Sequence, residues 1–120
     1  IDEVVNCGGI AEKNPMVMQI YADVCNRPMR ISRSAQTPAL GAAIFGAVAA
    51  GAVEDVSAAQ AKMTGTKDVV YRPIPENVAV YERLYALYME LHDAFGGVNR
   101  SADLSGVMKE LITIRQAARN

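Results

Sequence analysis

Two adjacent glycines, Gly8 and Gly9, are the feature of the sequence that could most directly do chemistry. They follow a short β-type run, Glu3 to Cys7, and precede Asn14-Pro15, a typical start of a helix. Paired glycines let a flat or anionic ligand approach the backbone, because no Cβ stands in the way and positive φ is tolerated. Free N–H groups at the next helix start would suit the phosphate or ribose of a nucleotide. The pair could equally be only a tight strand-to-helix turn.

Neither of two common nucleotide motifs surrounds this pair. No glycine stands two residues before or three after it, so the pattern is not GxGxxG, and no Gly-Lys-Ser/Thr follows as in a P-loop. Lys13, near the helix entrance, is the kind of residue that is usually a solvated charge. Asn14 is better explained as an N-cap than as a ligand, because Pro15 follows it directly.

The elements around the glycines alternate between strand and helix. After the first strand, the spacing predicts a helix from Pro15 to about Asn26, a strand over Met29 to Ser32, and a small-residue helix over Ala39 to Ala50. This order is typical of a βαβ layer and predicts an α/β fold. A short helix should end near Gly65, and Val70 to Pro75 should be an extended crossing segment.

Two amphipathic helices are predicted to complete the chain. The longer one should end at Gly96-Gly97, and the last should begin near Ser101. The predicted core face of the longer helix consists of Tyr81, Leu84, Tyr85, Tyr88, Leu91 and Phe95. His92 lies beside that face and is expected to be a packing or surface histidine. Cys7, on a buried type of strand, is expected to be a small core residue.

Composition limits the function classes further. The chain has 120 residues and a formal net charge of −1, so it carries no electrostatic signal for nucleic acid or for an anionic membrane. No apolar run reaches the ~20 residues that span a bilayer, and the first residues lack a signal-peptide pattern. The lack of a spanning run and of a signal peptide leads us to expect a cytoplasmic location. The two cysteines and one histidine form no metal-ligand pattern, so we expect no metal bound by this chain.

Three segments together resemble the C-terminal region of the FGGY family of carbohydrate kinases. They are Gly8 to Asn14, Asn26-Arg27-Pro28, and Thr37 to Ala43, and the resemblance extends from Val4 to about Gly51. The helical tail resembles the family only loosely. Within the family, Gly-Gly-Ile-Ala-x-Lys-Asn and the Asn-Arg-Pro turn are most similar to the members that phosphorylate ribulose.

The resemblance implies a place in the actin-like ATPase superfamily, in which two RNase H-like domains close around ATP and a sugar. Residues 1–65 would be the C-terminal segment of the second RNase H-like domain, and residues 66–120 a helical extension packed on it. Gly8 and Gly9 would then lie against the nucleoside. Lys13 stands where relatives often have an adenine-contacting asparagine, and with Asn14 it completes the implied cofactor-binding set. No catalytic residue is expected in this chain.

The activity implied is phosphoryl transfer from ATP to a ketopentose hydroxyl, from ribulose to ribulose 5-phosphate in the breakdown of arabinose. Mg²⁺ is implied as well, with ligands outside this chain, since transfer from ATP needs a metal to neutralise developing charge. We therefore expect an excised C-terminal piece that is inactive alone. Two alternatives stay open: an FGGY kinase for xylulose, gluconate or glycerol, and a non-enzymatic helical oligomerisation module. A homodimer is also left open.

Overall fold

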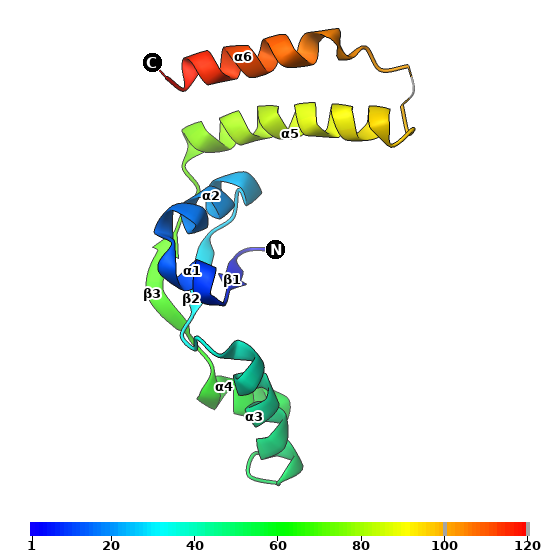
Figure 1. Cartoon of the computed structure of the whole chain (residues 1–120). Coiled ribbons are helices and arrows are strands. Elements are labelled where there is room, and N and C mark those ends of the chain that lie inside the picture. Colours follow the sequence, from blue (N-terminus) through cyan, green and yellow to red (C-terminus); the bar gives the residue numbers. More distant parts are fainter. Residues whose placement is uncertain (100, 120) are drawn as a thin grey trace. The chain divides into compact units, whose positions relative to one another are not determined.

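The computed structural model describes residues 1–99 and 101–119, and the chain divides into two compact units, Ile1–Ile74 and Pro75–Asn120. Figure 1 shows the elements in sequence colours. The predicted boundary lay after residue 65, but the division falls later because the segment that follows Gly65 is a strand of the first unit's sheet. None of the described helices has both the length and the apolar character needed to cross a membrane.

The first unit is built on a three-stranded sheet in the order β1-β2-β3. β1 (Val4–Asn6) runs parallel to β2 (Met29–Ser32), with Val5 opposite Arg30. β3 (Thr66–Tyr71) pairs antiparallel with β2, and the register shifts between Arg30 and Ser32. The helices α1 (Gly9–Lys13) and α2 (Pro15–Cys25) form the crossover between β1 and β2. The predicted strand-helix-strand order is confirmed.

The core of this unit lies between the crossover helices and the sheet. Its buried members are Ala11, Met18, Ala22, Met29 and Ile31, and Val4 and Tyr71 pack against them. Tyr21 and Val24 of α2 are exposed and lie outside this core. The buried face of α2 is formed by Met18, Ala22 and Asp23.

A pair of helices follows the second strand. α3 (Thr37–Ala49) contains no charged residue, and Ile44 is the residue that it buries. α4 (Val56–Met63) packs against α3 and begins with Asp55, whose Oδ1 accepts a hydrogen bond from the Ala58 N–H at 2.7 Å. β3 comes directly after α4. The chain then leaves the sheet through the two prolines of Pro73-Ile74-Pro75.

The second unit is helical, as predicted. α5 (Pro75–Phe95) ends where Gly96-Gly97 was expected to stop it, and Gly97 has φ 75°. A 3₁₀ turn, η1 (Leu104–Gly106), leads into α6 (Val107–Ala117). Asp103, rather than Ser101, begins this region by accepting a hydrogen bond from the Ser105 N–H at 2.9 Å. This bond to the backbone, the largest contribution, holds the pKa of Asp103 below its ordinary value.

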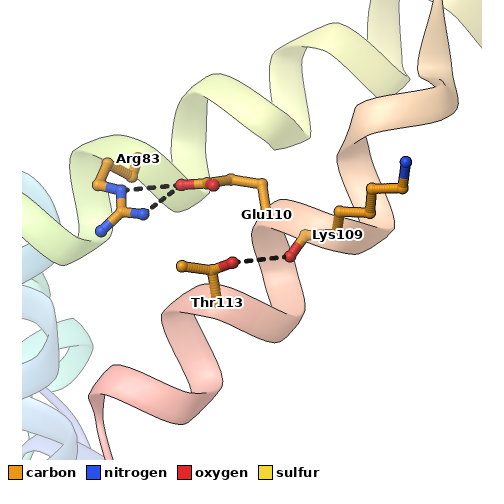
Figure 2. Close-up of polar contacts among 4 residues, drawn as sticks. All are labelled: Arg83, Lys109, Glu110 and Thr113. Atoms are coloured by element: carbon orange, nitrogen blue, oxygen red, sulfur yellow. Dashed lines mark hydrogen bonds and ion pairs between the residues drawn. The ribbon is translucent and has the colours of Figure 1, made fainter.

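Two helices of this unit are joined by an ion pair (Figure 2). The Arg83 guanidinium of α5 donates through Nε to Glu110 Oε1 of α6 at 3.1 Å, and a second nitrogen binds the same oxygen. Val107 and Ile114 of α6 are buried. The predicted core face of α5 is wrong in part, because Tyr85, Tyr88 and Phe95 are exposed. His92 is exposed, as expected, with Nδ1 at 3.1 Å from Asp93 Oδ1.

Candidate functional site

The Gly8-Gly9 turn connects the end of β1 to the start of α1. Gly8 has φ 92° and ψ 170°, a conformation that is essentially restricted to glycine. Gly9 has no such constraint, since its φ lies outside the left-handed range. A Cβ placed on either residue would meet no other atom within 4 Å. The space in front of both residues is therefore open, and the backbone at this turn is approachable by a ligand.

This turn follows the carboxyl end of a strand that pairs in parallel with its neighbour. In α/β sheets, ligands bind beyond the carboxyl ends of parallel strands. Cys7, between β1 and Gly8, is exposed, so the prediction that it belongs to the core is wrong. The strand ends at Asn6, and Cys7 already belongs to the turn. The turn thus offers backbone groups and small side chains, a surface suited to contact a flat ligand.

An ion pair connects α1 to the sheet. Lys67 Nζ of β3 lies 2.6 Å from Glu12 Oε1 of α1. The hydrogen bond from Lys67, and then the attraction of its charge, lower the pKa of the Glu12 carboxyl from its ordinary value. Ala11 of α1 is buried in the core, and this contact also holds α1 in place. Lys67 was missed by sequence reasoning, because it is separated from Glu12 by 55 residues.

Lys13 and Asn14 lie at the junction of α1 and α2, and both are exposed. Asn14 Oδ1 accepts a hydrogen bond from the Val17 N–H at 3.1 Å, so its predicted role as N-cap of α2 is confirmed. Lys13 is the last residue of α1. The four predicted site residues are neighbours in the sequence and lie in one short segment, Gly8 to Asn14. The ion pair of Glu12 with Lys67 fastens this segment to β3.

No group of three or more His, Cys, Asp or Glu side chains that could hold a metal occurs within residues 1–99 and 101–119. The groups that the turn offers to a ligand are its open backbone and the side chain of Lys13. A helix as short as α1 offers little dipole of its own. Such a site fits a neutral or weakly charged part of a ligand, such as a nucleoside.

Comparison with known proteins places this arrangement in the sugar kinases. Residues 1–50 match the family described as "FGGY family of carbohydrate kinases, C-terminal domain". A ribulokinase of Bacillus licheniformis is 51% identical over 115 residues, which cover 92% of this chain and 20% of that protein. One of Geobacillus thermodenitrificans is 48% identical over 124 residues, covering 99% of this chain and 21% of that protein.

Solved structures agree with the sequence matches. A ligand-bound xylulose kinase from Lactobacillus acidophilus superposes with a TM-score of 0.67 and 29% identity, covering 77% of this chain and 18% of that one. A gluconate kinase from the same organism gives 0.64 and 29%, covering 75% of this chain and 18% of that one. Residues 1–50 belong to the FGGY family of carbohydrate kinases, and the α/β fold of the actin-like ATPase type expected from the sequence is confirmed. The chain spans about a fifth of the length of these curated relatives.

Proposed function

We propose that this chain is the C-terminal part of an ATP-dependent sugar kinase that phosphorylates ribulose. The observation that carries the proposal is the difference between two degrees of similarity. Relatives named ribulokinase are 51% and 48% identical to this chain, whereas the solved xylulose and gluconate kinases are 29% identical. The match to ribulokinases includes the helical tail, which lies beyond the FGGY match over residues 1–50.

Within this kinase, residues 1–65 would supply part of the adenosine site on the sheet that β3 completes, and the helices α5 and α6 would form the helical extension. Gly8 and Gly9 would let the nucleoside lie flat against the backbone, which the open space before both residues permits. Lys13 would reach ribose or phosphate oxygens from the end of α1. Asn14 would act mainly by capping α2, since its Oδ1 already binds the Val17 N–H.

The rest of the reaction would depend on polypeptide outside this chain. Phosphoryl transfer requires the γ-phosphate, a metal ion and the nucleophile to be held together. Mg²⁺ would neutralise charge on the phosphates, and the described residues offer no cluster of ligands for it. We expect the kinase to work in the cytoplasm, where ATP is available, and this chain alone to have no activity.

The nucleotide site can be tested in the full-length kinase with Gly9→Val and Gly9→Ala. A Cβ at Gly9 would meet nothing within 4 Å, and Gly9 has no positive φ, so the fold should be kept. We expect Gly9→Val to raise the KM for ATP about tenfold or more, corresponding to about 1.4 kcal/mol of lost contact, and Gly9→Ala to raise it less. Gly106→Val, at another open glycine, is the matched control and should leave the KM unchanged.

An unchanged KM for ATP in Gly9→Val would contradict the nucleotide site while leaving the sugar assignment intact. That assignment requires a separate panel in which release of ADP is measured with ribulose, xylulose, gluconate and glycerol. We expect the highest kcat/KM with ribulose. A preference for xylulose or gluconate would instead support the second candidate, a kinase like the two solved structures.

A further inference from the structure

The Gly8-Gly9 turn leads into α1, a helix that is too short to be stable by itself. α1 has five residues, and the Glu12 N–H donates to the Gly8 carbonyl at 3.2 Å. The Asn14 N–H, at the end of α1, donates to the Ile10 carbonyl at 3.0 Å. Isolated helices of fewer than about 12 residues are marginal in water, and most helical stability in proteins comes from tertiary packing. The position of α1 therefore depends on its contacts with the rest of the first unit.

α1 is attached to that unit by one small buried side chain and by one ion pair. The buried residue is Ala11, whose side chain is a single methyl group. In the ion pair, Lys67 Nζ lies 2.6 Å from Glu12 Oε1. The other residues of α1 are exposed, and Ile10 is 69% exposed. A segment with so little buried apolar surface opens at small cost, so each of its attachments matters.

The ion pair holds α1 at a point that the neighbouring backbone does not reach. α1 is joined through Cys7 and Gly8 to β1, which is an outer strand of the sheet order β1-β2-β3. Lys67 belongs to β3, the strand on the other side of β2. Attachments to β1 and to β3 together fix both the position and the direction of α1. Without Lys67, α1 could turn about its connection to β1 and about its junction with α2 at Asn14.

The electrostatics of the pair agree with this role. The hydrogen bond from Lys67, and then the attraction of its charge, lower the pKa of the Glu12 carboxyl, so the two charges stabilise each other. The side chains of Lys67 and Glu12 are 37% and 33% exposed, and solvent therefore screens the pair. Exposed ion pairs contribute little to stability. Loss of this pair should therefore change the behaviour of α1 by a few-fold rather than abolish its structure.

We propose that Lys67 is a positioning residue of the Gly8-Gly9 turn. Through Glu12 it holds α1, and with α1 the backbone of Gly8 and Gly9, in the arrangement against which a nucleoside would lie. The inference rests on the proposed function, since it requires that this turn binds a nucleotide. The apparent affinity for a ligand falls with the fraction of molecules whose site is arranged to bind it, so a loosened α1 would weaken the binding of ATP.

Steady-state kinetics of the full-length kinase test this with Lys67→Met and a matched control, Arg30→Met. The control removes another exposed ion pair of the same sheet, in which Arg30 Nε lies 2.8 Å from Glu3 Oε2. We expect Lys67→Met to raise the KM for ATP about two- to fivefold. It should leave kcat and the KM for ribulose unchanged, because the turn would contact the nucleoside rather than the reacting atoms. Arg30→Met should change none of the three constants, and Lys67→Arg, which keeps the charge, should largely preserve the KM for ATP.

A second measurement follows α1 itself and uses no nucleotide. The amide protons of Glu12 and Asn14 are held by the hydrogen bonds of α1. Hydrogen exchange of a peptide covering residues 9–14, measured by mass spectrometry, therefore reports how often this helix opens. Exchange should be about two- to fivefold faster in Lys67→Met and unchanged in Arg30→Met.

A double mutant separates positioning from a direct contact with the nucleotide. Glu12→Gln breaks the same ion pair from the other side, so it should raise the KM for ATP about as much as Lys67→Met does. Because both changes remove one interaction, the double mutant should raise the KM no further. If Lys67 bound the phosphates directly, Glu12→Gln would free the lysine and lower the KM for ATP, which would overturn the proposal.

Other results would overturn it as well. They are an unchanged KM for ATP or unchanged exchange of α1 in Lys67→Met, an equal rise of the KM in Arg30→Met, and a failure of Lys67→Arg to preserve the KM. The variant Gly9→Val distinguishes these from a failure of the nucleotide site. If Gly9→Val raises the KM for ATP and Lys67→Met does not, only the positioning role is wrong. If neither variant raises it, the nucleotide site itself is wrong, and the positioning role is wrong with it.

Discussion

Asp23 should hold the end of the sheet unit in place, and its removal gives the sharpest test of the fold. This residue of α2 is 2% exposed. Its Oδ1 accepts hydrogen bonds from the Ile74 N–H at 2.8 Å and from the Gln19 Nε2 at 2.9 Å. Gln19 Nε2 also donates to the Arg72 carbonyl at 2.8 Å. Together these bonds fasten the segment after β3 to α2, so Asp23→Ala should release it.

The expected size follows from the bonds that are lost. A hydrogen bond to a charged group contributes about 1.5–3 kcal/mol. In Asp23→Ala the Gln19 amide can turn towards water, but the part-buried Ile74 N–H loses its acceptor. We therefore expect opening at Ile74 to become easier by about 2–3 kcal/mol, about a 30- to 150-fold increase in its hydrogen exchange. Asp23→Asn keeps the oxygen but not the charge, and should increase exchange only about five- to tenfold.

The sequence makes this amide convenient to measure. Pro73 and Pro75 have no N–H, so Ile74 supplies the one backbone amide proton of that tripeptide. The difference in deuterium uptake between overlapping peptides that end at Arg72 and at Pro75, measured by mass spectrometry, therefore reports Ile74 alone. The experiment can be done in the full-length kinase, where no assumption about independent folding is needed.

The matched control is Asp68→Ala, which removes an exposed aspartate of β3 and should leave the exchange of Ile74 as it is. If Asp23→Ala also leaves that exchange rate unchanged, the hydrogen bond does not stabilise the segment. If Asp23→Asn accelerates exchange as much as Asp23→Ala does, the charge rather than the geometry of the acceptor carries the whole effect. Either result would refute the reasoning above.

Three further predictions concern the candidate site. Gly8→Ala should lower the free energy of unfolding by about 1–3 kcal/mol, because φ 92° with ψ 170° is strained for alanine; thermal denaturation would check this, and an unchanged Tm would contradict it. Asn14→Ala should lose about 1 kcal/mol of helix capping and accelerate exchange of the Val17 amide about fivefold, whereas Asn14→Ser should largely preserve its protection. Glu12 has a lowered pKa, so its pairing with Lys67 stabilises the fold above the ordinary carboxyl pKa, and this stabilisation is lost as pH falls through the lowered pKa. In Lys67→Met, an NMR titration should show the pKa of Glu12 rising towards its ordinary value. No rise would exclude Lys67 as the cause of the lowered pKa.

Local signals in the sequence were sufficient for most of the element order. Asn14-Pro15 marks the start of α2 because the amide caps the helix and proline needs no hydrogen-bond acceptor there. Gly96-Gly97 marks the end of α5 because a glycine can adopt the left-handed conformation found at Gly97. Each of these signals depends on neighbouring residues only. Their physical cause is therefore present in the sequence itself.

Contacts between distant segments could not be predicted in this way. The pairing of Glu12 with Lys67 requires β3 to lie beside the crossover, and no local pattern fixes that position. The buried face of α5 shows a second difficulty. Leu84, Leu87 and Leu91 have the same helical spacing as Tyr85, Tyr88 and His92, which are displaced from them by one residue, so periodicity alone cannot tell which set is covered. The sequence pattern therefore mixed Leu84 and Leu91 with the exposed Tyr85 and Tyr88.

The apolar helix α3 also has more exposed apolar surface than an isolated small protein would normally have. A helix that is apolar all round is normally buried on several sides, yet within the described residues α3 buries only Ile44, and Phe45 is 65% exposed. α4 covers one side of it. The remaining apolar surface would be costly in water, as would the exposed rings of Tyr85, Tyr88 and Phe95 on α5. Both surfaces support the proposal that this chain works as part of a larger protein.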